Sequence, residues 1–261
     1  MSANECPADI FQKNIKGILL DAPELIENTT LRGIFFIHKP KKQLIIKQTT
    51  AKRINMFLSI ERRRTLYKLK NRLRLRNRKF SLIASNCTGM FILKDLNLPY
   101  RSPFVNLWLY PNDFIKFLSR PEHYMAQPLE FINKPNIKYP VGRLDDIEIY
   151  FQHFSSAQSA REKWVRRAQR IDMNNLFIIM TDRDGCTYEN MLQFDNLPYK
   201  NKVIFTHKPY PEIKSAVYIP GFKHMGCVGM LYEYPTPKSF KRFYDTFDYV
   251  KWFNQGKNNK N

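Results

Sequence analysis

Glycine, cysteine and long apolar runs are scarce in this sequence, and each shortage excludes a class of protein. The chain has 9 glycines among 261 residues, about half of the usual share of roughly 7%, which argues against collagen-like and repeated glycine-loop designs. Its four cysteines contain no Cys-x-x-Cys pair, so a zinc knuckle is not expected. Apolar runs such as residues 176–180 stop far short of the ~20 residues that a membrane-spanning helix needs.

The start of the chain also lacks a targeting signal. Residues 1–9 are acidic, and they lack the basic segment and apolar stretch of a signal peptide. The expected location is the cytoplasm, either free or attached peripherally to the inner face of the cell membrane.

The chain contains enough apolar side chains for a core and a large excess of basic ones. Hydrophobic residues make up 43% and aromatic residues 14%, which excludes a mainly disordered chain. The formal net charge is +20, and residues 52–79 alone carry 12 basic side chains and one acidic side chain. Apolar residues recur in this stretch at spacings of three and four, which predicts a basic amphipathic helix; they are Ile54, Phe57, Leu58, Leu66, Leu69 and Leu73.

Three surroundings suit a basic amphipathic helix of this kind. Anionic lipid headgroups attract the lysines and arginines while the apolar stripe enters the acyl region, so an anionic membrane surface is the expected partner of residues 52–79. A solvated helix packed on the rest of the protein is the plainer alternative. Nucleic acid is not an expected partner, because the chain has no homeodomain, RNA-recognition or zinc-finger signature.

The composition divides the chain into four segments. They are a variable N-terminal extension at residues 1–51, the basic helix at 52–79, an α/β domain at 80–254 and a polar tail at 255–261. Met56 opens a stretch that reads as a natural N-terminus, so a functional start at Met56 rather than Met1 remains an alternative.

Residues 80–254 alternate short apolar runs with helical patterns. This alternation predicts an α/β fold with a mainly parallel sheet and helices on both faces. Helices are expected to begin at Pro111, after an N-cap at Ser155, and after Thr236 and Pro237. Strands are expected at residues 80–86, 104–110, 144–154, 176–182, 201–207 and 216–220.

Polar side chains follow several of the predicted strands. Ligands of open parallel sheets bind beyond the carboxyl ends of the strands, so these side chains are candidates for a shared site. The candidates are Asn86 after the first strand, Asp182, Arg183 and Asp184 after the fourth, and His207 and Lys208 after the fifth.

The triplet of Asp182, Arg183 and Asp184 has the acid-x-acid pattern of many sugar transferases that use nucleotide-sugars. Two carboxylates so spaced hold Mg²⁺ or Mn²⁺, which bridges the donor diphosphate. The alternative is a polar turn in which Asp184 caps a helix that starts near Thr187.

His207 and Lys208 suit a reaction that displaces a phosphate. The histidine would act as a general base, and the lysine would neutralise the leaving group. Asn86, Arg183 and Lys208 are assigned to substrate binding. An ordinary loop with a hydrogen-bonded histidine is the alternative.

Other candidates lie outside these strand ends. Asp146 and Glu148 are also assigned to substrate binding. They would share one face of a strand, where like charges raise one pKa as an acid–base pair requires; solvated acids are the alternative. Trp108 and Tyr110 would stack on a sugar ring or pack in the core. Cys87 would be a thiolate nucleophile or a simple buried thiol.

Six stretches between residues 80 and 218 form a distinctive ordered series, namely SLIASNCTG, SPFVNLWLYPNDFIKFL, YPVGRLDDIEIYFQHF, REKWVRRAQRID, NLFIIMTDRDGC and LPYKNKVIFTHKPYP. In these stretches the chain resembles an uncharacterised bacterial family, domain of unknown function 1919, whose members are often labelled exopolysaccharide biosynthesis proteins. The resemblance implies two α/β subdomains and a setting among the enzymes of capsule, exopolysaccharide or lipopolysaccharide assembly.

These observations together favour a transferase, most simply a glycosyltransferase that moves a sugar from a nucleotide-sugar to a lipid-linked glycan acceptor. One alternative is an acyltransferase that modifies the polysaccharide, using His207 with Ser85 or Cys87. The other is a non-enzymatic membrane or nucleic-acid adaptor, in which the basic stretch matters and the strand ends do not.

Overall fold

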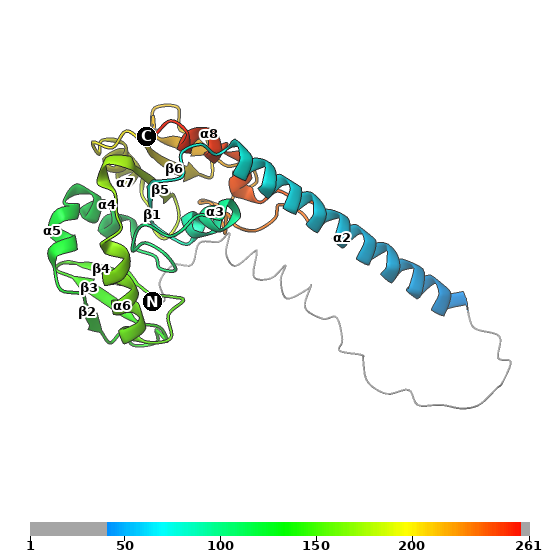
Figure 1. Ribbon diagram of the computed structural model, residues 1–261, viewed down its shortest axis with the longest axis horizontal. Helices are drawn as coiled ribbons and strands as arrows, with labels where there is room; N and C mark the ends of the chain where they lie inside the picture. The colour runs from blue at the N-terminus through cyan, green and yellow to red at the C-terminus, as the bar shows by residue number, and fades with distance from the viewer. Residues whose placement is uncertain (1–40, 257–261) are drawn as a thin grey trace.

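The computed structural model describes residues 41–256, with side chains from residue 56 onward (Figure 1). Most of the predicted N-terminal extension, and all but two residues of the predicted polar tail, therefore lie outside the described residues.

A four-stranded parallel sheet forms the centre of the fold. Its order is β1 (Ser81–Ala84), β5 (Leu176–Thr181), β6 (Lys202–Thr206) and β7 (Ala216–Tyr218). Every neighbouring pair is parallel, so the predicted α/β fold is confirmed. β5 is buried along its whole length, as expected for a strand covered on both faces.

Helices cover both faces of this sheet because alternate strand residues point to opposite sides. Leu82 and Phe177 face a core that includes residues of α3 (Thr88–Leu96) and α8 (Tyr249–Phe253). Ile83 and Ile178 face a second core. That core includes residues of α4 (Pro111–Ser119), α6 (Ala157–Ala168) and α7 (Tyr188–Asp195).

A smaller antiparallel sheet lies beside α4 and α5 (Pro121–Ala126) (Figure 1). It consists of β2 (Glu130–Ile132), β3 (Val141–Leu144) and β4 (Ile147–Tyr150), paired in that order.

The single strand expected at residues 144–154 is wrong. Asp145 adopts a left-handed φ of 54°, which aspartate tolerates well, and the chain reverses there into a β3–β4 hairpin. Residues 104–110 are not a regular strand either, since they make only an isolated bridge between Trp108 and Tyr150.

Two helix boundaries also differ from the prediction. Ser156, rather than Ser155, caps α6, because its hydroxyl accepts a hydrogen bond from the Ser159 N–H at 3.2 Å. The expected continuous helix after Thr236 is replaced by the 3₁₀ turn η2 (Phe243–Thr246) and by α8. The Phe243 N–H donates instead to the Glu233 carbonyl, which removes it from a helical ladder. A further 3₁₀ turn, η1, spans Met173–Asn175.

The basic helix α2 spans Lys41–Arg74, so it begins and ends earlier than predicted. Its C-terminal part packs on the domain, while its N-terminal part extends away (Figure 1). Arg64 is only 2% exposed and pairs with Asp95 and Asp245. Asn71 donates to the Tyr249 hydroxyl at 3.1 Å. The packed part of the basic helix therefore belongs to the folded domain.

No helix among the described residues combines the length and apolar character needed to cross a bilayer.

Removing residues 1–55 is expected to leave a cooperatively folded domain, because Ile60, Arg64, Asn71 and Leu75 remain to pack against it. Removing residues 1–79 is expected to abolish cooperative unfolding, since the acids that face Arg64 would lose their partner. Thermal melts of the two truncations measure this. Cooperative melting of the protein that lacks residues 1–79 would show that α2 is not needed for folding of the domain.

Candidate functional site

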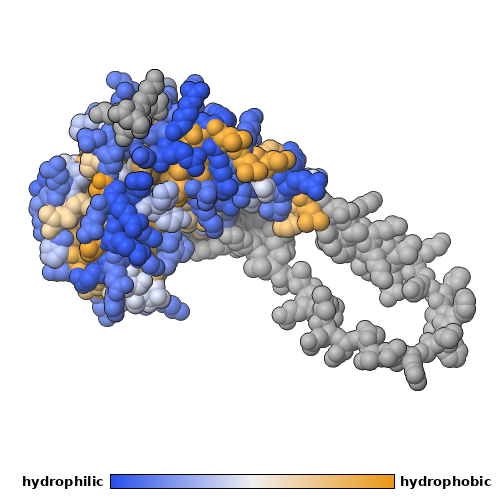
Figure 2. Space-filling model, viewed as in Figure 1, coloured by the Kyte–Doolittle hydropathy of each residue, from blue (hydrophilic) through white to orange (hydrophobic). Residues whose placement is uncertain are grey.

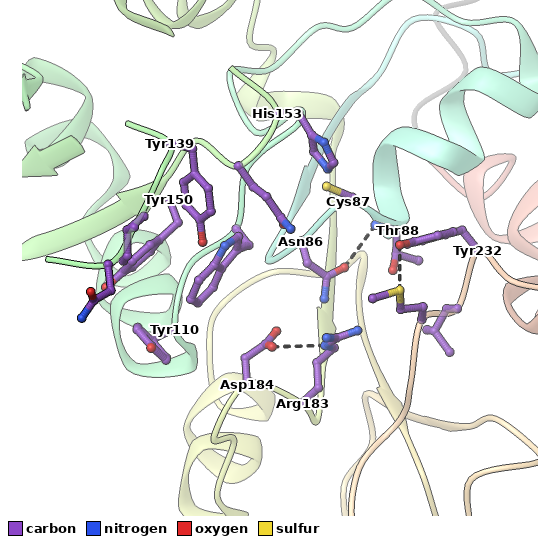
Figure 3. Close-up of a pocket in the computed structure, with 16 residues that line it drawn as sticks. Asn86, Cys87, Thr88, Tyr110, Tyr139, Tyr150, His153, Arg183, Asp184 and Tyr232 are labelled. Carbon is purple, nitrogen blue, oxygen red and sulfur yellow. Dashed lines mark hydrogen bonds and ion pairs between the residues drawn. The ribbon is translucent and has the colours of Figure 1, made fainter. Parts of the chain in front are cut away.

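A cavity of about 480 Å³ lies at the carboxyl ends of β1 and β5, where the parallel sheet faces the antiparallel one (Figure 3). This is the place where open α/β sheets bind ligands. Its walls come from the segments after β1 and β5, from residues 108–110, from the loop between β2 and β3, from the end of β4 with the residues that follow it, and from residues 230–232. The lining residues are Asn86, Cys87, Thr88, Trp108, Tyr110, Asn136, Ile137, Tyr139, Tyr150, Gln152, His153, Arg183, Asp184, Met230, Leu231 and Tyr232.

Asn86 is held in one orientation at the base of the cavity. Its amide nitrogen donates to the Thr181 hydroxyl at 2.8 Å, and its amide oxygen accepts from the Thr88 N–H at 3.1 Å. The first of these bonds joins the ends of β1 and β5, and the second lies within the segment after β1. Together they hold the Asn86 amide in a fixed orientation.

Asp184 is the one carboxylate among the described residues that line this cavity. It adopts a left-handed φ of 60°, and its carboxylate accepts a hydrogen bond from the Arg183 Nε at 3.2 Å. The side chains of Arg183 and Asp184 are 15% and 24% exposed. A cation and an anion therefore lie side by side in the wall.

Asp184 is not the cap of the following helix. The Thr187 hydroxyl accepts from the Asn190 N–H at 3.2 Å, and the Asn190 side chain accepts from the Thr187 N–H at 3.1 Å. This reciprocal capping box satisfies the start of α7, so the capping alternative for Asp184 is wrong.

Asp182 and His207 are in direct contact beneath the cavity. One carboxylate oxygen of Asp182 accepts from the His207 N–H at 2.7 Å and from its ring Nδ1 at 2.5 Å. The other accepts from the Val228 N–H at 2.8 Å. Burial raises the pKa of Asp182, and these three hydrogen bonds oppose that rise.

These contacts make Asp182 a positioning residue that joins β5, β6 and the segment at Val228. Neither Asp182 nor His207 lines the cavity. Their convergence was anticipated from the strand ends, whereas their burial was not.

The expected Mg²⁺ or Mn²⁺ site gains no support from this geometry. Both oxygens of Asp182 are occupied by N–H donors, while Asp184 faces the cavity. Within the described part of the chain, no group of three or more His, Cys, Asp or Glu side chains is arranged to hold a metal ion.

Three other predicted site residues lie outside the cavity lining. The Lys208 amine is 5.2 Å from the centre of the Tyr210 ring. Asp146 accepts from Lys116 and from Tyr124, each at 2.7 Å. Glu148 accepts from Tyr150 and pairs with Lys134, also at 2.7 Å each.

The expected acid–base pair of Asp146 and Glu148 is wrong. Hydrogen bonds from Lys116 and Tyr124 lower the pKa of Asp146. Burial acts to raise the pKa of Glu148, but the hydrogen bonds from Lys134 and Tyr150 outweigh it and lower that pKa. Each acid has its own donors, so the two carboxylates share no proton.

An aromatic wall lies across the cavity from Asn86 and Asp184 (Figure 3). Trp108 and Tyr150 stack with ring centres 4.2 Å apart and an interplanar angle of 17°. Tyr110 meets both rings edge-on, at 4.9 Å and 5.5 Å. Burial raises the pKa of Tyr150, as does its hydrogen bond to Glu148, so the phenol is a neutral donor.

Sequence reasoning singled out Trp108 and Tyr110 but missed several of their neighbours. The missed lining residues include Tyr139, Tyr150, Gln152, His153 and Tyr232. No motif marks them, because the antiparallel hairpin and a distant C-terminal segment bring them to the cavity. The one available signal was the recurrence of tyrosine in residues 139–150.

Cys87 lines the cavity as a protonated thiol. It is 9% exposed, and burial raises its pKa to about 11. The thiolate is the nucleophilic form of cysteine, so the cysteine-based acyl-transfer alternative is disfavoured at neutral pH.

The chain is similar to a known protein family and to a known protein. A family model described as "Domain of unknown function (DUF1919)" matches residues 59–254. An uncharacterized protein of Haemophilus influenzae (strain ATCC 51907 / DSM 11121 / KW20 / Rd) is 49% identical over 209 residues, which cover 80% of this chain and 96% of that relative. The family match begins within α2, so it includes the buried Arg64.

Proposed function

This chain belongs to the DUF1919 family, and we propose that it is a transferase of bacterial surface-polysaccharide assembly. Its simplest form is a glycosyltransferase that binds a nucleotide-sugar in the cavity and serves a lipid-linked glycan acceptor. The observation that carries the proposal is the stacked pair of Trp108 and Tyr150 across from Asn86, Arg183 and Asp184.

The composition of the walls suits a sugar. Small-molecule sites are mostly apolar clefts of roughly 300–1,000 Å³ with a few precisely placed polar groups, and the cavity of about 480 Å³ falls in that range. Aromatic rings pack against the C–H faces of a pyranose, and phenol groups bond to its hydroxyls. The Asn86 amide and the Asp184 carboxylate supply fixed polar partners.

In the proposed reaction, the Asp184 carboxylate accepts the proton of the attacking acceptor hydroxyl. The acceptor oxygen bonds to the anomeric carbon of the donor sugar, and the bond from that carbon to the donor phosphate breaks. The nucleoside diphosphate leaves with the electron pair. The Arg183 guanidinium stabilises the negative charge that develops on the phosphate.

Asp182 and His207 support this reaction indirectly. Their hydrogen bonds hold the ends of β5 and β6 together, directly before Arg183 and Asp184. They are positioning residues, because neither lines the cavity.

A thermal-shift screen of nucleotide-sugars, free nucleotides and acyl thioesters tests the proposal. A ligand at ~100 times its Kd stabilises a protein by about 2.7 kcal/mol, which raises the Tm of a domain of this size by roughly 5–10 °C. We expect this shift from at least one nucleotide-sugar. We also expect Trp108→Leu to reduce the shift, and the matched control Tyr218→Leu, at a partly exposed tyrosine outside the cavity, to leave it unchanged.

Two outcomes would contradict the proposal. A shift with acyl thioesters alone would favour acyl transfer. A shift with none of the ligands would favour the adaptor alternative.

A further inference from the structure

One face of α2 presents a row of leucines to solvent. Leu58, Leu66, Leu69 and Leu73 are 59%, 59%, 46% and 86% exposed. At 3.6 residues per turn these four side chains fall within an arc of about 80°. We call them the leucine face of α2.

The leucine face points away from the domain. The opposite side of α2 carries Ile60, Arg64 and Asn71, all of which are buried, and Leu75 directly after the helix is buried as well. Scattered surface leucines are ordinary, but Leu66, Leu69 and Leu73 form an uninterrupted exposed apolar row, and such a row marks an interaction surface. Figure 2 shows apolar side chains along α2 where the helix leaves the domain, with hydrophilic ones on either side.

Basic side chains lie within the leucine face and on its flank. Arg62 lies between Leu58 and Leu66 along the same side of the helix. Arg62, Lys68 and Lys70 form no ion pair with any residue in the described part of the chain. Glu61 is the one acidic residue between positions 52 and 79, so the surface is strongly cationic.

The orientation of the leucine face is fixed by the packing beneath it. Arg64 pairs with Asp95 and Asp245, and Arg74 pairs with Asp248. The Arg72 Nε donates to the Asp95 carbonyl at 2.8 Å. Since these contacts join α2 to the C-terminal segment and to α3, the helix cannot rotate to bury its leucines without breaking them.

We propose that the leucine face of α2 docks on an anionic lipid bilayer. The leucines enter the boundary between headgroups and acyl chains, and the surrounding arginines and lysines contact lipid phosphates. A bilayer fits better than a protein groove, because an apolar row set among cations that pair with no acid in the described part of the chain matches a surface whose phosphates lie directly above hydrocarbon. The domain would then be held at a fixed angle to the membrane.

Vesicle sedimentation of the full chain tests this inference. The probes are vesicles of phosphatidylglycerol and phosphatidylcholine in equal parts, and vesicles of phosphatidylcholine alone. At ~0.1 M salt, where the Debye length is about 10 Å, we expect at least a tenfold larger partition coefficient for the anionic vesicles. Raising the salt to ~1 M shortens that length to about 3 Å and should remove most of the difference.

A matched pair of triple variants distinguishes binding through the leucine face from nonspecific hydrophobic binding to vesicles. Leu66→Gln, Leu69→Gln and Leu73→Gln together should lower the anionic partition coefficient about tenfold or more, with little change in Tm because glutamine is a good helix former. The control replaces three partly exposed apolar residues elsewhere with glutamine, namely Val165, Met173 and Leu192. It should bind as the unaltered chain does.

Several results would overturn the inference. Equal binding to neutral and anionic vesicles would show that the basic side chains do not contribute to binding. Undiminished binding by the leucine variant would show that the leucines do not contribute. A dimer that the leucine variant dissociates, without vesicle binding, would assign the face to a second copy of the chain. Binding of the full chain to a DNA or RNA duplex, without binding to vesicles, would assign the leucine face to nucleic acid. The cavity plays no part in these measurements, so they are independent of the proposed function.

Discussion

Replacing Arg64 by alanine is expected to destabilise the protein by about 3–5 kcal/mol, the usual effect of removing one partner of a buried ion pair. Arg64 is 2% exposed and faces the carboxylates of Asp95 and Asp245. It also donates to the Tyr244 hydroxyl at 3.1 Å. Without the guanidinium, two buried acids would lie near each other with no cation between them.

The measurement is a thermal melt, in which the Tm should fall by roughly 6–20 °C for a domain of this size. The matched control is Arg62→Ala, an exposed arginine two residues earlier on the same helix, which should change the stability by at most about 0.5 kcal/mol. Equal melting temperatures for the two variants would show that Arg64 does not anchor α2.

Replacing Asp184 by asparagine is expected to lower the transfer rate by about 10²–10⁴, the usual contribution of a general base. The substitution removes the carboxylate of Asp184, the only one that the described residues contribute to the cavity lining, and keeps the shape of the side chain. Asparagine also adopts the left-handed conformation readily, so the φ of 60° at this position is preserved and the Tm should stay close to that of the unaltered chain.

Asp145→Asn is the matched control for this variant. Asp145 is also left-handed, with a φ of 54°, but it lies in the β3–β4 turn and bonds to His123 at 2.9 Å. The Asp145→Asn variant should therefore keep the transfer rate of the unaltered chain. An unchanged rate in Asp184→Asn would exclude this acid as the base, and a large drop in Tm would assign it a structural role instead.

The strands of the parallel sheet could be predicted because their signal is local. Residues 176–180 form an uninterrupted apolar run within the expected strand at 176–182, and β5 occupies Leu176–Thr181. The runs at 80–86, 201–207 and 216–220 likewise contain β1, β6 and β7. A strand covered on both faces needs apolar side chains at successive positions, and such a run is visible without any knowledge of its neighbours.

The antiparallel β3–β4 hairpin could not be predicted from a local pattern. Residues 144–154 alternate like one long strand, but the chain reverses at Asp145 and Asp146, which precede β4. The alternation continues through the turn, so periodicity alone does not separate one strand from two.

The candidate site, too, could be predicted only in part. The segments after β1 and β5 could be expected at one edge of the sheet, because parallel strands share the direction of their carboxyl ends, and Asn86, Arg183 and Asp184 do line one cavity. Which acid faces that cavity was decided by hydrogen bonds from distant segments. The N–H groups of His207 and Val228 occupy Asp182, whereas Asp184 extends into the cavity.

The sequence by itself determined the parallel sheet, the excess of positive charge and the spacing of the leucines in α2, since each depends only on the order of residues along the chain. The tertiary structure alone decided that Arg64 is a buried anchor while its basic neighbours are exposed, and that Trp108 meets Tyr150 in the wall of a cavity. Both outcomes depend on contacts between residues far apart in the chain. Asp245 lies 181 residues from Arg64, and no local pattern records which side chain it will meet.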